Sequence, residues 1–126
     1  MKYKSIASIT AILTFINAIL FLALPALTMS MFGRTLSTTG IMNTRISGAC
    51  ALGLSLVLWQ LKDLPPSRMQ TAISKSLLLT MIVLVIIDLH GILTGAVNQF
   101  GWIIFFVDIL MVAGFLSVVF TGTINN

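Results

Sequence analysis

The chain has 126 residues, of which 58% are hydrophobic and only 8% charged, and its mean hydropathy is +1.10. Soluble domains carry about a quarter charged residues, so this composition excludes a polar surface on all sides and favours an integral membrane protein. The net charge of +4 comes from seven basic residues scattered near the ends of apolar segments, a pattern that indicates membrane topology and no nucleic-acid partner. Cys50 is the only cysteine, which excludes an intrachain disulfide and any multi-cysteine metal site.

Four apolar segments, each long enough to cross a bilayer, take up most of the sequence. We expect helices at about residues 6–24, 44–61, 72–97 and 102–121, and therefore a single all-α domain over residues 1–126. The first segment imitates a secretory signal peptide, but its apolar stretch exceeds the usual signal core, so we interpret it as a membrane helix. We expect Pro25 to kink or end it and residues 26–43 to hold a short interfacial helix and a loop. The prediction is a four-transmembrane-helix, up-down-up-down bundle.

The basic residues predict how this bundle is oriented. Five of the seven fall on one side of the membrane, and these are Lys2, Lys4, Lys62, Arg68 and Lys75. Arg34 and Arg45 fall towards the other side. Since cytoplasmic loops carry the excess of Lys and Arg, both termini and the Pro65–Pro66 loop are predicted to be cytoplasmic. The expected location is the inner membrane of a bacterial cell, as a multi-pass protein.

The third segment carries an acid, Asp88, in a stretch that must cross hydrocarbon, where a charged side chain is costly and by default a functional candidate. At about 1.5 Å per residue, Asp88 and Asp108 both fall in the outer half of the membrane, and Arg45 begins its segment near that outer edge. We therefore predict a buried polar cluster of Arg45, Asp88 and Asp108. It is either a structural clamp between helices or a ligand or ion site. Catalysis is the weakest interpretation, because no enzyme motif is present.

The single histidine and four glycines complete the candidate residues. His90 points about 200° away from Asp88 around the helix, so the two are no ready-made ligand pair. It is either a satisfied or interfacial histidine, or a ligand to a haem, metal or pigment, and no cofactor can be named. Because small residues let helices approach closely in lipid, four glycines are expected to pack helices together: Gly48, Gly53, Gly91 and Gly95.

The last three segments contain several short motifs: Arg45-x-x-Gly48-Ala49, Leu52-Gly53, Trp59, Asp88-x-x-Gly91, Gly95, Gly101-Trp102 and Asp108. In these residues the chain resembles the small bacterial four-helix membrane proteins loosely grouped as DoxX-like, over nearly its whole length. The resemblance implies the four-helix fold, a cytoplasmic-membrane location and an accessory role beside a respiratory or other redox complex. It implies no catalytic residue.

Three functions are compatible with these features. The first is a non-enzymatic accessory or structural subunit of a larger membrane complex, redox or energy-transducing, since apolar helix faces and short loops leave lateral contact as the main capacity of the chain. The second is a lipid- or quinone-binding protein that uses the Arg45, Asp88 and Asp108 site. The third is a small oligomeric transporter with Asp88 as the carrier of an ion or proton. The expected partners are the lipid bilayer and either other membrane subunits or further copies of the chain.

Overall fold

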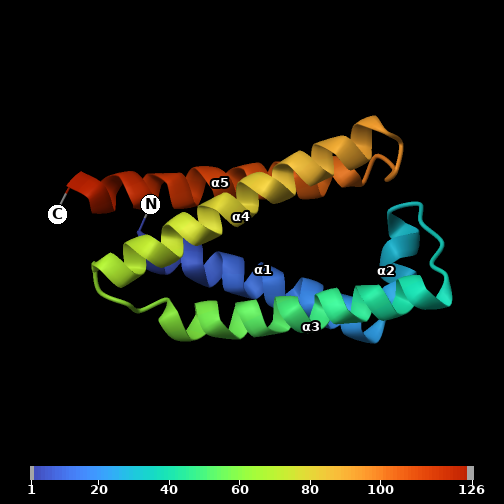
Figure 1. Ribbon diagram of the computed structural model, residues 1–126, viewed down its shortest axis with the longest axis horizontal. Helices are drawn as coiled ribbons and strands as arrows, with labels where there is room; N and C mark the ends of the chain where they lie inside the picture. Colours follow the sequence, from blue (N-terminus) through green and yellow to red (C-terminus); the bar gives the residue numbers. More distant parts are fainter. Residues whose placement is uncertain (1, 125–126) are drawn as a thin grey trace.

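The computed structural model describes the backbone of residues 2–124 and the side chains of residues 2–121, and over this part it is all-helical (Figure 1). The helices are α1 (Tyr3–Ala23), α2 (Pro25–Met31), α3 (Thr38–Leu61), α4 (Arg68–Leu93) and α5 (Gly101–Ile124). Four of them, α1, α3, α4 and α5, are long and apolar enough to cross a membrane. The predicted all-α class with four spanning helices is confirmed, and α2 is the short additional helix expected after Pro25.

Local capping explains where the helices begin. Pro25 occupies the first turn of α2, where its missing N–H costs nothing, and α1 ends at Ala23 before it. Ser37 caps α3, because the Gly40 N–H donates to Ser37 Oγ at 3.1 Å. This cap starts α3 at Thr38, earlier than the predicted residue 44, and so places Arg45 two turns inside the helix.

The end of α4 also differs from the prediction, and Gly95 is the reason. The helix ends at Leu93, and Gly95 follows with φ +67°, a left-handed conformation that favours glycine. The Ala96 N–H donates to the Gly91 carbonyl at 2.8 Å, and the Gly95 N–H donates to the Ile92 carbonyl at 3.1 Å. This pair of hydrogen bonds closes a Schellman motif. Residues 94–97, predicted as helix, therefore turn towards α5.

The long helices form two pairs that meet at only one end. α1 packs along α3 and α4 packs along α5, whereas the backbone of α3 makes no contact with α4 or α5 anywhere in residues 2–124. The two pairs are joined through a smaller contact of α1 with α5, and they diverge from there towards α2 (Figure 1). At the diverging end, Asn98 bonds to the end of α2 through its backbone N–H to Phe32 O at 3.1 Å and its side-chain amide to Met31 O at 2.9 Å.

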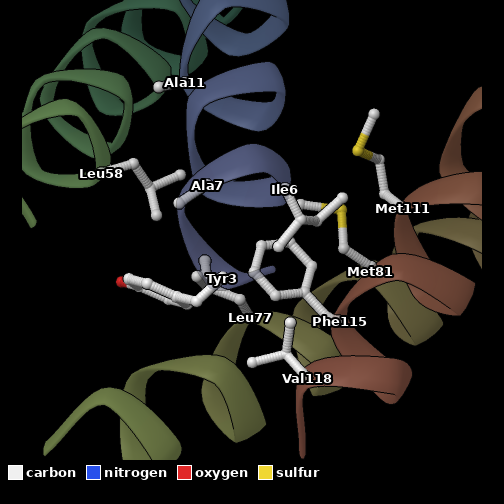
Figure 2. Close-up of a cluster of buried hydrophobic side chains, with 10 residues drawn as sticks. All are labelled: Tyr3, Ile6, Ala7, Ala11, Leu58, Leu77, Met81, Met111, Phe115 and Val118. Atoms are coloured by element: carbon white, nitrogen blue, oxygen red, sulfur yellow. The ribbon is translucent and has the colours of Figure 1, made fainter. Parts of the chain in front are cut away.

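The buried core lies where the two pairs converge, and Figure 2 shows that residues from α1, α3, α4 and α5 contribute to it. Phe115 is fully buried beside Ile6, which is 2% exposed. The Ile6 side chain also packs against Gly114, where an added Cβ would lie 2.9 Å from Ile6 Cγ1. Next to them, the Thr10 hydroxyl donates to Met111 Sδ at 3.3 Å. These contacts hold α1 against α5, and so hold the two pairs together.

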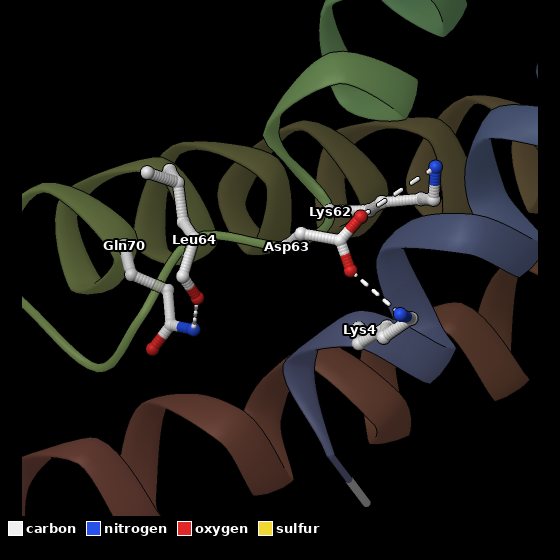
Figure 3. Close-up of polar contacts among 5 residues, drawn as sticks. All are labelled: Lys4, Lys62, Asp63, Leu64 and Gln70. Atoms are coloured by element: carbon white, nitrogen blue, oxygen red, sulfur yellow. Dashed lines mark hydrogen bonds and ion pairs between the residues drawn. The ribbon is translucent and has the colours of Figure 1, made fainter.

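The same end of the molecule carries most of the basic residues. Lys4 Nζ lies 2.7 Å from Asp63 Oδ1, which fixes the start of α1 beside the loop between α3 and α4 (Figure 3). Lys62 Nζ lies 3.7 Å from the other oxygen of Asp63. The hydrogen bond from Lys4, with the charges of both lysines, holds the pKa of the Asp63 carboxyl below its ordinary value. We call this the basic end, and the opposite one, with α2 and the α4–α5 turn, the α2 end.

Candidate functional site

Two aspartates form a pair between α4 and α5. Asp88 lies on α4 and Asp108 on α5, both are half-buried, and their side chains interact directly. Asp88 Oδ2 is buried from solvent, and a protonated Asp108 is the donor that faces Asp88 in the described part of the chain. We call these two residues the acid pair. Carboxyl groups that face each other without a donor or a cation are unfavourable unless something neutralises them.

The antiparallel packing of α4 on α5 brings the two acids to one level. Asp88 precedes the end of α4 at Leu93 by five residues, and Asp108 follows the start of α5 at Gly101 by seven. At 1.5 Å per residue these positions are about 7 and 10 Å inside their helices, counted from the α2 end. The acid pair therefore lies within the apolar length of both helices, in the half nearer the α2 end. A charge at that depth is costly and marks a functional candidate.

Arg45, the third member of the predicted cluster, does not join the acid pair. It lies on α3, which packs on α1 and α2 and has no backbone contact with α4 or α5 over the described residues. Its side chain is exposed and forms no ion pair or hydrogen bond with any residue described. Arg45 also points about 180° away from Leu54, a residue of α3 that packs against the core. Depth along the helix was predicted from the sequence, but position around the bundle was not.

His90 stands apart from the acid pair as well. Its side chain is exposed, and its backbone carbonyl accepts a hydrogen bond of 2.7 Å from the Thr94 hydroxyl at the end of α4. Within the described residues, no group of three or more His, Cys, Asp or Glu side chains is placed to hold a metal ion. A cofactor role for His90 stays a prediction that nothing around the ring supports.

Of the four glycines predicted to pack helices, one lies at a tight contact. Gly48 is buried against α1, and a Cβ there would lie 2.9 Å from Phe21 Cβ and 3.1 Å from the Ala18 carbonyl oxygen. An added Cβ would meet nothing within 4 Å at Gly53 or Gly95, and only a side-chain atom at 3.7 Å at Gly91. Gly95 is a turn residue, which corrects its assignment to a helix-packing stripe. Gly114, at the α1–α5 contact, is a packing glycine that the sequence reasoning missed.

Two shallow hollows lie nearer the basic end, and neither was predicted. An apolar groove of about 290 Å³ runs between α1 and α3, lined by Ala11, Ile12, Phe15, Ser55, Leu56 and Trp59. The Lys62 ammonium lies 3.8 Å from the centre of the ring of Trp59, which lines this groove, and makes a cation–π contact with it. A second hollow of about 260 Å³ is lined by Arg68, Thr71, Ala72 and Lys75 on α4. An amphipathic aromatic and lysines at this level are typical of a membrane interface.

Comparison of the chain with family models, with curated proteins and with solved structures found no match. The resemblance to DoxX-like proteins therefore stays a prediction that depends on the residues quoted for it. The fold and the site define a multi-pass membrane protein, all-helical over the described residues, that carries a half-buried acid pair at membrane depth.

Proposed function

We propose that this protein is a non-enzymatic subunit of a larger membrane assembly, and that the acid pair is its main point of attachment. One observation carries the proposal: Asp88 and Asp108 form a half-buried pair of carboxyls at membrane depth, and no cationic side chain of residues 2–121 forms an ion pair with either of them. Lipid tails offer no cation either, and intramembrane acids pair with other groups or with backbone. A helix of another chain that presents a basic, amide or hydroxyl group can reach the exposed part of this half-buried pair.

The remainder of the molecule suits a role in lateral contact. The connections between helices are short, and large apolar side chains are exposed along all four spanning helices. Lipid covers such faces as readily as protein does, so they permit association without specifying it. The acid pair supplies specificity, because only a chain that brings a matching polar group to that depth gains from the contact.

The proposal includes an orientation. The start of α1 and the loop after α3 share the basic end, and the excess of Lys and Arg there places that end in the cytoplasm under the positive-inside rule. The acid pair then lies in the outer half of a bacterial inner membrane. A redox or energy-transducing complex is the proposed host, on the resemblance described above.

Blue-native electrophoresis after mild extraction from the host membrane tests the proposal. We expect the wild type to migrate within an assembly, and Asp88→Asn and Asp108→Asn to release free chain, because an amide removes the charge that a partner's cation neutralises. Asp63→Asn is the matched control, since it makes the same chemical change at an exposed acid outside the spans. Equal migration of all three variants and the wild type would remove the acid pair from the account.

A second candidate function is the transport of a proton or a small cation by an oligomer of this chain. The observation that favours it is that two carboxyls on adjacent helices face each other at membrane depth, an arrangement that can take up one proton or cation. Flux in liposomes that depends on pH, that Asp88→Asn abolishes and that Asp63→Asn leaves unchanged would support transport. A chain that assembles but carries no flux would leave the subunit function alone.

A further inference from the structure

We propose that the group completing the acid pair is Arg45 of a second copy of this chain, inserted in the same orientation. This inference rests on the proposed function and names the partner. One chain contains both members of the ion pair but does not bring them together, since α3 makes no backbone contact with α4 or α5 over the described residues. Two copies side by side can do so.

Depth is the first argument for the pairing. Arg45 follows the start of α3 at Thr38 by seven residues, so it lies about 10 Å inside that helix from the α2 end. The acid pair lies about 7–10 Å inside α4 and α5 from the same end. The hydrogen bonds of Asn98 to Met31 and Phe32 tie the α4–α5 turn to α2 and so keep these ends at one level. Parallel copies in one membrane therefore present Arg45 and the acid pair at matching depth.

Charge and exposure are the second argument. Arg45 is exposed and has no ion-pair partner among the described residues, although its helix is apolar enough to span the membrane. An unpaired arginine and a carboxyl pair without a cation are each costly at this depth in lipid, and the cost of both falls when they meet. The arginine fork can also bond two carboxyl groups at once, which a lysine cannot do with the same geometry.

Helical phase sets the form of the assembly. Arg45 points about 180° away from Leu54, which packs against the core, whereas the acid pair lies on the other helix pair. The contact thus joins two different surfaces of the chain. Such a contact closes either as a symmetric dimer, when both surfaces border one interface, or as a small ring, when they do not. In both forms every Arg45 meets one acid pair, so its single positive charge balances one ionised carboxyl while the other carboxyl keeps its proton.

Mixed crosslinking in host membranes tests this directly. Two copies with different tags, both carrying Cys50→Ser to remove the exposed native thiol, are co-expressed with Arg45→Cys in one and Asp108→Cys in the other. Two cysteines at these positions would lie too far apart to form a disulfide, because a cysteine is much shorter than an arginine. A short membrane-permeant bis-methanethiosulfonate is therefore used as the crosslinker to span the remaining distance. We expect a crosslinked species that carries both tags.

The controls use exposed neighbours at nearly the same depth but on other faces. Ile46→Cys replaces Arg45→Cys in one pairing, and Leu110→Cys replaces Asp108→Cys in another, with both native side chains more than half exposed. The two control pairings should give little mixed product. Equal yields from all pairings would overturn the proposal, as would a crosslink within one chain that carries both Arg45→Cys and Asp108→Cys.

Variants that keep the native cysteine provide a second readout, which guards against misfolding of the cysteine variants. Energy transfer between fluorescently labelled copies in vesicles measures their association. Arg45→Ala should lower this transfer, as expected if the dissociation constant between copies rises about thirtyfold or more. Arg45→Lys should restore most of it. If the wild type remains in an assembly, but no mixed crosslink forms and Arg45→Ala leaves energy transfer unchanged, then a second copy is not the partner. The proposed function would still stand. A monomer in the wild type would overturn both.

Discussion

The contact between α1 and α3 depends on Gly48, and replacing this residue by alanine should weaken it. An added Cβ would lie 2.9 Å from Phe21 Cβ and 3.1 Å from both Leu22 Cγ and the Ala18 carbonyl oxygen. Distances near 3 Å are inside normal contact, and a backbone oxygen cannot rotate away as a side chain can. The two helices must therefore move apart.

The magnitude follows from two opposing terms. Overpacking of a well-packed contact costs about 1–3 kcal/mol, and replacing glycine by alanine within a helix returns about 0.5–1 kcal/mol. We expect Gly48→Ala to lower the free energy of unfolding by about 1–2 kcal/mol. Gly53→Ala is the matched control on the same helix, because its Cβ would meet nothing within 4 Å, and it should be neutral or slightly stabilising.

Equilibrium unfolding in mixed micelles, followed by the fluorescence of the two tryptophans, Trp59 on α3 and Trp102 on α5, measures the difference between these two variants. We expect a clear loss of stability for Gly48→Ala and none for Gly53→Ala. If both variants match the wild type, or if both gain stability, then α1 and α3 do not approach each other as closely at Gly48 as described.

Three further predictions concern polar contacts. Lys4 lowers the pKa of Asp63 below its ordinary 3.8. Their ion pair should therefore contribute to stability above pH 3.8 and lose this contribution as the pH falls through the lowered pKa. The free energies of unfolding of the wild type and of Asp63→Asn should converge in acid. Asn98→Ala removes the side-chain hydrogen bond to Met31 O at the end of α2. Hydrogen exchange of the backbone amides of α2 should therefore accelerate by about two- to tenfold, the equivalent of one hydrogen bond. Unchanged exchange in α2 would contradict this. Thr10→Val is nearly isosteric and removes the hydrogen bond to Met111. It should loosen the α1–α5 contact and lower the free energy of unfolding by about 1 kcal/mol. A Thr10→Ser variant that behaves like Thr10→Val would refute the role of the hydroxyl.

The class of protein and the four spanning helices could be predicted because they depend on local properties. Length and hydropathy specify a membrane helix, and Pro25 cannot continue one. Helix ends were less predictable, since they depend on single capping contacts. Ser37 extends α3 backwards by its bond with the Gly40 N–H, and Gly95 ends α4 by its left-handed backbone. A Ser before Thr-Thr-Gly and a Gly after Leu-Thr were the available signals.

The candidate site shows the same division between what is local and what is not. The level of Asp88 and Asp108 follows from the helical rise alone, and the structure does bring these two together. Arg45 shares their level but lies on a different side of the molecule. The side on which a residue lies depends on which helices pair, and hydropathy does not encode that pairing. For the same reason Gly48 and Gly53, equally small in the sequence, differ in the structure: only Gly48 faces α1.

The most direct test of the central claim is native mass spectrometry of the wild-type protein, gently extracted from its host membrane. In the proposed function, the acid pair, which has no cationic partner among the described residues, is the point at which another chain attaches. We expect a mass that contains at least one further polypeptide, a second copy above all. A single chain, stable on its own and free of any bound partner, would contradict it.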